Sequence, residues 1–245
     1  MKILVIGETC VDEFIYGKID RLCPEAPVPV FVPTETITNS GMSGNVVANI
    51  KALNPKAKIE HWHQTTSITK TRFVDQKSNQ MVIRVDKGDS DVIPLKHLHK
   101  NIETIKKADI VIVSDYNKGF INDNYIIDIA RNAKFSILDS KRKLNRDLIK
   151  HFTFVKLNES EALQNKEIAQ SPNIITTLGS KGASYQGKII PQSNPQQTID
   201  VSGAGDTFVA AFALNYYSYS NVTEAIYYAN QMASNVVSKR GVATP

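Results

Sequence analysis

The stretch Asp200-Val201-Ser202-Gly203-Ala204-Gly205-Asp206-Thr207 decides the fold of this chain, because here a glycine-rich turn leads directly into an apolar segment. Residues 208–214 read Phe-Val-Ala-Ala-Phe-Ala-Leu and predict a buried helix. A glycine turn at the start of such a helix points several backbone N–H groups at one place, where they can bind an anion. Asp206 would lie in the first helical turn, beside that anion.

Two interpretations of this stretch stay open. A site that holds a phosphate next to a carboxylate base can move the phosphate to a hydroxyl, which is kinase chemistry. An aspartate in the first turn of a helix is also favoured by the helix dipole alone. The P-loop pattern is absent from the sequence, and Glu8-Thr9 after the apolar segment 2–7 breaks the dinucleotide-binding pattern. Both of those nucleotide-binding folds are therefore disfavoured.

The composition is that of a soluble globular protein, with 245 residues, 42% hydrophobic and 22% charged. No apolar run approaches the ~20 residues of a membrane helix, and the N-terminus starts with a core-type strand. We therefore expect a cytoplasmic protein without membrane contact. Cys10 and Cys23 have no neighbours at metal-ligand spacing and are expected to be reduced thiols. The net charge of +5 is scattered along the chain, so we expect no nucleic-acid partner.

Short apolar strands alternate with helical patterns, which predicts an α/β fold. We expect strands at 110–114, 135–139, 154–157 and 174–177, and helices at 45–53 and 122–132. Polar residues or glycine end several of the strands: Asp115, Asp139, Asn158 and Gly179. Ligands bind at the carboxyl ends of the strands in an open α/β sheet, so these residues predict where the site lies.

Two segments, about 12–40 and 69–86, do not follow this alternation. The first contains four prolines among β-branched residues, which predicts extended, edge-type strands. The second alternates like a hairpin, with a polar turn near 77–79. We expect the two segments to form a small β-sheet lid, whose free edges favour a homodimer.

Three further motifs each allow a structural and a functional interpretation. Asn158-Glu159-Ser160-Glu161 is either a capping box or a pair of side chains beside a hydrated Mg²⁺. The turn from Thr177 to Gly182 holds two glycines, and either lets a nucleotide approach the backbone or is a plain hairpin turn. Lys118 is either a surface charge or a phosphate contact.

Taken together, the motifs resemble those of the ribokinase (PfkB) family of carbohydrate kinases. Residues 200–207 resemble the C-terminal signature of that family, and 158–161 resemble its Asn-x-x-Glu magnesium motif. Residues 20–30, Asp-Arg-Leu-Cys-Pro-Glu-Ala-Pro-Val-Pro-Val, are similar to a Ser-Pro-Glu-Ala-Pro-Val-Pro-Val stretch of its heptose 7-phosphate kinase domains. Residues 114–119, Ser-Asp-Tyr-Asn-Lys-Gly, resemble their Ser-Asp-Tyr-Gly-Lys-Gly. Further matches follow in order along the chain at 69–72, 79–80 and 84–86.

The resemblance implies one kinase domain over residues 1–245, a three-layer α/β/α sandwich with a mostly parallel central sheet and a lid. It implies that Asp206 is the general base and that the anion hole is formed by Gly203, Ala204 and Gly205. The implied sugar- and phosphate-binding residues are Asp12, Asn45, Arg72, Gln80, Arg84 and Lys118. The implied nucleotide-binding residues are Asn158, Glu161, Thr177, Gly179, Gly182 and Asn230. Of these, Asn158 and Glu161 would also organise the Mg²⁺ that accompanies ATP, through water, and a monovalent cation is a further possibility.

The chain also departs from the family pattern. The subfamily's Gly-Gly-Ala-Ala-Asn is replaced by Gly41-Met42-Ser43-Gly44-Asn45, and its Asp-Pro-Lys by Asp139-Ser140-Lys141. A strand–helix segment is lacking between Asn54 and Thr69, and the stretch 161–173 is abbreviated. No nucleotidyltransferase domain follows Pro245, so we expect the second activity of bifunctional relatives to be absent.

From the resemblance we expect phosphorylation of a heptose 7-phosphate at its anomeric hydroxyl, giving the 1,7-bisphosphate for ADP-heptose and surface polysaccharide synthesis. One alternative is a kinase for another sugar, such as fructose, or for a nucleoside. Another is a degenerate relative that binds a ligand without catalysis. The missing segments favour the degenerate relative, whereas the intact Asp206, Asn158 and Glu161 disfavour it.

Overall fold

The computed structural model describes residues 1–192, 201–239 and 241–245 and contains two β-sheets. Within these residues the larger sheet has eight strands, in the order β12-β11-β10-β9-β8-β7-β1-β4. Neighbouring strands from β4 to β10 are parallel, whereas β11 and β12 are antiparallel. The strand bounds are β1 (Lys2–Gly7), β4 (Lys58–Trp62), β7 (Ile110–Asp115), β8 (Ser136–Ser140), β9 (Phe154–Asn158), β10 (Ile174–Thr177), β11 (Ala183–Tyr185) and β12 (Lys188–Ile190).

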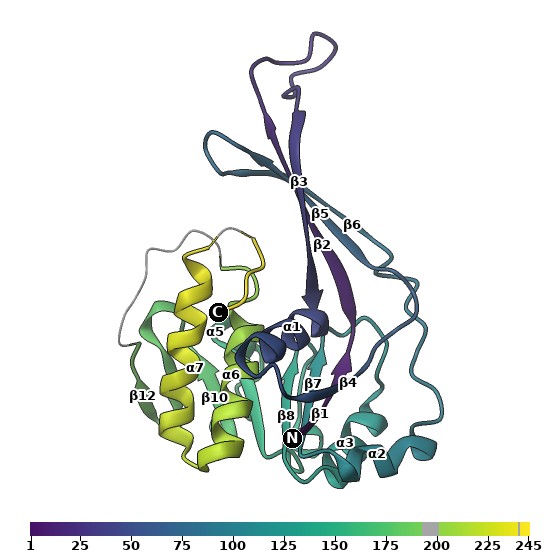
Figure 1. Cartoon of the computed structure of the whole chain (residues 1–245), viewed down its shortest axis with the longest axis vertical. Coiled ribbons are helices and arrows are strands. Elements are labelled where there is room, and N and C mark those ends of the chain that lie inside the picture. The colour runs from purple at the N-terminus through teal and green to yellow at the C-terminus, as the bar shows by residue number, and fades with distance from the viewer. Residues whose placement is uncertain (193–200, 240) are drawn as a thin grey trace.

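Helices cover both faces of this sheet, which makes the predicted three-layer α/β/α sandwich (Figure 1). On one face lie α1 (Ser43–Leu53), α6 (Ala204–Tyr219) and α7 (Val222–Val237). On the other face lie α2 (Ile102–Lys107), α3 (Asp123–Asn132), α4 (Arg146–Ile149) and α5 (Glu159–Gln164). The described part of the chain also has two short 3₁₀ helices, at Leu98–Asn101 and Gly179–Lys181.

The apolar strands form two cores because successive side chains of a strand point to opposite faces. In β1, Ile3 and Val5 pack toward α1 and α6, whereas Leu4 and Ile6 pack toward α2 and α3. All four are at most 2% exposed. Burial on both faces explains why these strands are continuous apolar runs rather than alternating ones.

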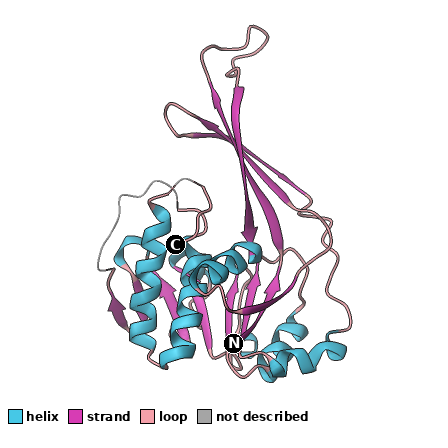
Figure 2. Cartoon of the chain, in the orientation of Figure 1, coloured by secondary structure: helices cyan, strands magenta, loops and turns pink. Residues whose placement is uncertain are grey.

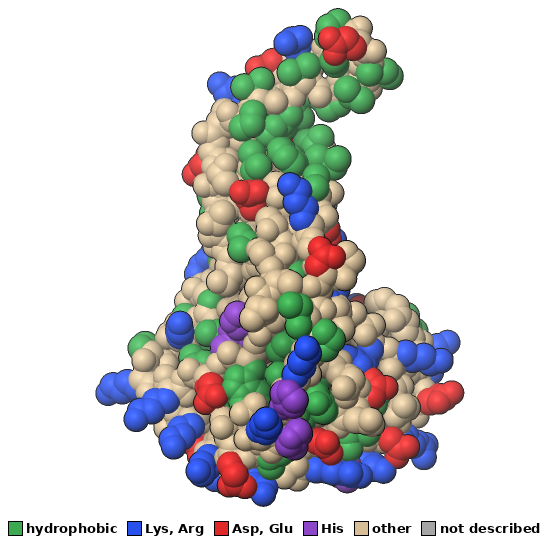
Figure 3. All heavy atoms as spheres, turned by 90° about the vertical axis from the view of Figure 1, so that its right-hand side faces the viewer, with side chains coloured by type: hydrophobic (Ala, Val, Ile, Leu, Met, Phe, Trp, Pro, Cys, Tyr) green, Lys and Arg blue, Asp and Glu red, His purple; other side chains and the backbone are tan. Residues whose placement is uncertain are grey.

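The smaller sheet is the predicted lid, with strand order β3-β2-β5-β6. Its strands are β2 (Thr9–Lys18), β3 (Val32–Met42), β5 (Thr69–Asp75) and β6 (Met81–Lys87). Since β1 ends at Gly7 and β2 starts at Thr9, the lid rises directly from the carboxyl ends of the parallel strands (Figures 1 and 2). Seen from the side, the lid is a narrow arm with hydrophobic side chains gathered on its upper part (Figure 3).

The predicted edge-type strands are only partly present in the first lid segment. β3, which carries Pro33, is an outer strand, as predicted. β2 is an inner strand that pairs with both β3 and β5, so for β2 the prediction was wrong. The other three prolines, Pro24, Pro27 and Pro29, lie between β2 and β3, because a residue without an N–H interrupts a strand ladder.

The predicted lack of a strand–helix segment after Asn54 agrees with the position of β4 and with its short connection to the lid. β4 pairs with β1 alone, so it is an outer strand of the larger sheet in the described part of the chain. Six residues, 63–68, then lead from β4 directly into lid strand β5. No helix among the described residues has the length and apolar character needed to span a bilayer.

We predict that Phe212→Ala strongly destabilises the fold. Phe212 is 1% exposed in α6, and its ring packs edge-on against Phe154 and stacks with Tyr216. Removing it leaves a cavity between α6 and the sheet, so the free energy of unfolding should fall by about 3–5 kcal/mol. Urea denaturation followed by circular dichroism measures the loss. The control Tyr219→Ala, on the same helix and 70% exposed, should change it by less than about 1 kcal/mol; equal losses would contradict the packing.

Candidate active site

Gly203 and Asp206 show why the glycine turn precedes α6. Gly203 caps the helix with a φ of 82°, a left-handed conformation that glycine adopts without strain. A Cβ at this position would lie 2.5 Å from Nδ2 of Asn45. The glycine therefore lets α1 approach the start of α6, and Asp206 follows in the first helical turn, as predicted. Asp200, the first residue of the quoted stretch, lies outside the described residues.

The Asp206 carboxylate is buried and held by one donor on each oxygen. Asn45 in α1 donates from Nδ2 to Oδ2 at 2.9 Å, and the Tyr116 hydroxyl donates to Oδ1 at 3.2 Å. Burial and the nearby Asp139 carboxylate raise the pKa of Asp206 to about 6, against the two hydrogen bonds and Lys156, which lower it. Such a group is ionised near neutral pH and still basic enough to accept a proton.

Lys156 and Asp139 form a buried ion pair that the sequence analysis missed. The Lys156 ammonium lies 3.2 Å from each Asp139 oxygen, and both residues are at most 5% exposed. Its Nζ is also 3.0 Å from where a Cβ would stand on Gly205, so a positive charge lies beside the glycine turn. A lysine in the middle of an apolar strand, Phe154–Asn158, is the sequence feature that could have predicted this ion pair, since a buried lysine is costly unless paired.

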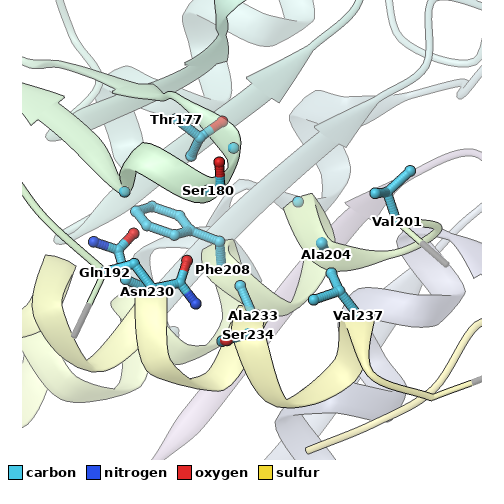
Figure 4. Close-up of a pocket in the computed structure, with 13 residues that line it drawn as sticks. Thr177, Ser180, Gln192, Val201, Ala204, Phe208, Asn230, Ala233, Ser234 and Val237 are labelled. Carbon is cyan, nitrogen blue, oxygen red and sulfur yellow. The ribbon is translucent and has the colours of Figure 1, made fainter. Parts of the chain in front are cut away.

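Four of the predicted nucleotide-binding residues line one cavity of about 190 Å³: Thr177, Gly179, Gly182 and Asn230. Asn230 reaches the cavity from α7 and donates to the Ile190 carbonyl at 3.0 Å (Figure 4). Apolar side chains of α6 and α7, with Phe208 among them, form part of its wall (Figure 4). Apolar walls with a few placed polar groups are typical of ligand pockets.

A second cavity adjoins the first and contains the Asp206 carboxylate. Its lining includes Asp206, Lys156 and Asn158, and it shares Thr177 and Gly205 with the first cavity. The two cavities meet at the start of α6. A nucleotide in the first would therefore direct its phosphates toward the carboxylate in the second.

The three residues predicted to form an anion hole lie at this junction. The Ala204 N–H points back to the Val201 carbonyl at 3.3 Å, a weak contact. Among the described residues the N–H groups of Gly203 and Gly205 have no protein acceptor. A positive helix terminus whose N–H groups have no acceptor among the described residues is suited to an anion.

Asn158 and Glu161 form the capping box of α5. Asn158 Oδ1 accepts from the Glu161 N–H, and Glu161 Oε2 accepts from the Asn158 N–H, both at 2.8 Å. The other Glu161 oxygen contacts the Lys141 ammonium. The structural interpretation is thus confirmed, and direct metal ligation by Glu161 would compete with both contacts.

A hydrated Mg²⁺ nevertheless fits this motif. Asn158 lines the second cavity, and each occupied carboxylate oxygen keeps a lone pair for a water molecule. Across the described residues there is no group of three or more His, Cys, Asp or Glu that would form a protein-made metal cage. Mg²⁺ commonly takes few protein ligands and relies on phosphates and water, so a sparse motif suits it.

The predicted basic residues of the lid region are each already paired with a carboxylate. Arg72 lies 2.5 Å from Asp12, and Lys118 lies 2.5 Å from Asp89. Arg84 binds both oxygens of Asp86, at 2.8 and 2.9 Å. A substrate phosphate would therefore have to share or displace these carboxylates.

Strand pairing places Arg72 and Arg84 next to each other, whereas Gln80 lies apart from them. Arg72 in β5 is directly opposite Arg84 in β6, and Asp12 in β2 is opposite Lys70 in β5. Gln80 lies in the exposed turn at the tip of the β5–β6 hairpin, where its backbone contacts Asp75 and Ser78. The structure does not place Gln80 beside the other predicted phosphate-binding residues.

Glu8 is a second residue that the sequence analysis missed. It is fully buried after β1 and accepts three backbone N–H groups of the loop that follows β7: Tyr116, Lys118 and Phe120. These bonds shape the loop that carries Tyr116 to Asp206. A glutamate inside an otherwise apolar N-terminal stretch was the available signal.

Comparison with known proteins identifies the family. The family model for pfkB family carbohydrate kinases matches residues 47–245, which is most of the chain. The chain belongs to the pfkB family of carbohydrate kinases. The predicted fold and enzyme class, an ATP-dependent carbohydrate kinase, are therefore confirmed.

Curated relatives of this pfkB chain carry the name "Bifunctional protein HldE". The protein of Helicobacter pylori strain G27 is 32% identical over 299 aligned positions, and that of Desulfatibacillum aliphaticivorans is 27% identical over 302. Each match covers 99% of this chain but only 64% and 61% of the relative. The alignments are longer than the 245 residues of the chain, so the relatives carry segments that it lacks.

Solved structures share the fold. Ribokinase of Arabidopsis thaliana, complexed with ribose and ATP, has a TM-score of 0.70 at 17% identity, covering 98% of this chain and 93% of that one. Phosphofructokinase-2 of Escherichia coli, in complex with potassium, has a TM-score of 0.73 at 15% identity, covering 98% and 94%. At such identities the likeness establishes the ribokinase fold alone.

We predict that Asp206→Asn stabilises the pfkB domain increasingly as pH rises. The pKa of Asp206 is raised from 3.8 to about 6 in the fold, so wild-type stability is lost as pH rises through this window. Asparagine cannot ionise, so the variant does not lose stability as pH rises through this window. In urea denaturation, the free energy of unfolding of the variant minus that of the wild type should increase by about 2 kcal/mol between pH 4.5 and 7.5.

The matched control is Asp109→Asn. The Lys2 N–H lowers the pKa of Asp109, so the stability that this carboxylate contributes is lost only as pH falls below about 4. The stability difference between Asp109→Asn and the wild type should therefore stay constant between pH 4.5 and 7.5. A pH-independent difference between Asp206→Asn and the wild type would show that the Asp206 pKa is not raised.

Proposed function

We propose that this chain transfers the γ-phosphoryl group of ATP to the anomeric hydroxyl of a heptose 7-phosphate, giving the 1,7-bisphosphate. One observation carries the proposal: a buried carboxylate, Asp206, stands beside a glycine turn where the cavity lined by four predicted nucleotide-binding residues meets the cavity that contains it. The Arabidopsis ribokinase, which shares this fold, was solved with a sugar and ATP. The name HldE in the curated relatives supports the choice of a heptose.

In this mechanism Asp206 takes the proton of the acceptor hydroxyl as the oxygen attacks the γ-phosphorus. The new P–O bond forms, the bond to the β-phosphate oxygen breaks, and ADP leaves. The N–H groups of Gly203 and Gly205, which have no acceptor among the described residues, and the Lys156 ammonium beside them oppose the charge on the transferred group. Phosphoryl transfer requires mainly such positioning and charge stabilisation.

Asn158 and Glu161 would hold Mg²⁺ through water at the same junction. The bound ion supplies positive charge to the nucleotide phosphates. Lys141, which contacts Glu161 and whose pKa is raised chiefly by Asp139, keeps its own charge there against burial. A monovalent cation near the glycine turn stays a further possibility of this proposal.

A second candidate is a kinase for an unphosphorylated sugar or a nucleoside. The observation that favours it is the pairing of Arg72, Arg84 and Lys118 with Asp12, Asp86 and Asp89. Cations that are already neutralised have less affinity for an anionic substrate. The lid would then recognise hydroxyl groups through the same carboxylates.

The lid also supports a homodimer within this proposal. β3 and β6 are its outer strands, and hydrophobic side chains are exposed on the arm, with Met81 57%, Ile83 56% and Val32 53% accessible (Figure 3). A second copy of the chain would cover these side chains and pair a free strand edge.

We predict that Asp206→Asn abolishes turnover while nucleotide binding persists. ADP release from Mg-ATP should be measured across heptose 7-phosphate, other sugar phosphates, free sugars and nucleosides. Loss of the base should lower kcat by about 10²–10⁴-fold. Binding of Mg-ADP, measured by calorimetry, should be unchanged because Asp206 does not line the first cavity. Undiminished turnover by Asp206→Asn would refute the assigned base.

We predict that Arg84→Ala raises KM for a phosphorylated sugar by about tenfold or more, since a charged hydrogen bond is lost. Its KM for ATP should not change. The control is Lys87→Ala, on the same strand β6 but on its opposite face. If both variants behave like the wild type, the lid does not bind a phosphate and the second candidate is favoured.

A further inference from the structure

The Tyr116 hydroxyl contacts the candidate base directly. It donates to Asp206 Oδ1 at 3.2 Å, while Asn45 donates to Oδ2 at 2.9 Å. A carboxylate with a donor on each oxygen cannot rotate about its Cβ–Cγ bond without losing both hydrogen bonds. The two donors come from different elements, α1 and the loop after β7, so the orientation of Asp206 is fixed by the packing of the fold.

Tyr116 is itself fixed on several sides. Its backbone N–H binds Glu8 Oε2 at 2.8 Å. The preceding residue, Asp115, is fully buried and bound at both oxygens by Arg142, at 2.6 and 2.9 Å. Two ammonium groups lie over the ring, with Lys70 of the lid 5.5 Å and Lys141 5.8 Å from its centroid. Each cation–π contact of this kind holds the ring in place.

We propose that Tyr116 is the positioning residue of the base: its hydroxyl holds the Asp206 carboxylate in one orientation and keeps it ionised. The inference rests on the proposed role of Asp206 in proton transfer. With Oδ1 bound to Tyr116 and Oδ2 to Asn45, each oxygen keeps a lone pair for an acceptor hydroxyl that enters the cavity lined by Asp206. Lys70 connects this arrangement to the lid, because it reaches the same ring from strand β5.

Burial raises the Asp206 pKa most, and several charged groups act on this pKa together with the hydrogen bonds from Asn45 and Tyr116, which lower it. Asp139 on β8 raises the Asp206 pKa, and Lys156 on β9 lowers it. Cys10 on β2 and Lys141 after β8 also interact with it electrostatically. Burial raises the pKa of Tyr116 well above its usual value, so the phenol stays protonated and acts as a donor throughout the working pH range.

The test is Tyr116→Phe, which removes one oxygen and keeps the ring that contacts the two lysines. The ¹³Cγ resonance of Asp206 is titrated in the ligand-free protein and assigned with Asp206→Asn. Loss of one donor should raise the midpoint by about one pH unit. The control is Tyr217→Phe, which removes a tyrosine hydrogen bond to another aspartate, Asp109, and should leave the Asp206 midpoint unchanged. An unchanged midpoint in Tyr116→Phe overturns the inference.

A kinetic measurement separates this inference from the proposed function. In Tyr116→Phe the acid limb of kcat/KM should move upward by the same interval, so activity relative to wild type falls about fivefold more at pH 6 than at pH 8.5. A purely structural defect would lower both equally and would raise KM for ATP. If the wild type turns over no acceptor, the proposed function fails while the titration still decides the role of Tyr116.

A second substitution tests the same hydrogen bond in case Tyr116→Phe does not fold. 3-Fluorotyrosine at position 116 keeps every contact but has a more acidic hydroxyl, which is a stronger donor. The Asp206 midpoint should then fall below that of the wild type. A rise or no change would count against the inference.

Discussion

The whole site depends on keeping one carboxylate ionised inside the protein. Asp206 is buried at the start of α6, close to a second buried acid, Asp139. An isolated charge at such a depth would be neutralised by protonation. Here Asn45, Tyr116 and Lys156 offset the cost, and each comes from a different element. α1, the loop after β7, and β9 must therefore pack correctly before a base exists at all.

The same constraint explains the surrounding polar residues. Lys156 neutralises Asp139, Arg142 neutralises Asp115, and Glu8 is satisfied by three backbone N–H groups. Each buried charge at the carboxyl ends of the strands is thus matched by a partner from a neighbouring loop or strand. Unpaired, these groups would destabilise the fold by several kcal/mol each. Paired, they hold the loops that form the walls of the site.

Much of the fold was readable in the sequence, because apolar runs of four to six residues ending in polar residues are typical of parallel strands. The strands at 110–115 and 154–158 and the helix at 204–219 lie where the pattern predicts them. The inner position of β2 could not be predicted from the sequence, since strand order depends on contacts between distant residues. Lys156 was missed because its partner, Asp139, belongs to another strand.

By itself, the sequence determined the glycine turn, the aspartate after it, the parallel α/β framework and the family. Those features are local, because turn geometry, helix starts and strand patterns follow from neighbouring residues. Only the tertiary structure decided that Asn45 and Tyr116 hold Asp206, that four of the predicted nucleotide-binding residues share one cavity, and that the lid cations are already paired. These are contacts between residues as much as 161 positions apart, and no local pattern encodes them.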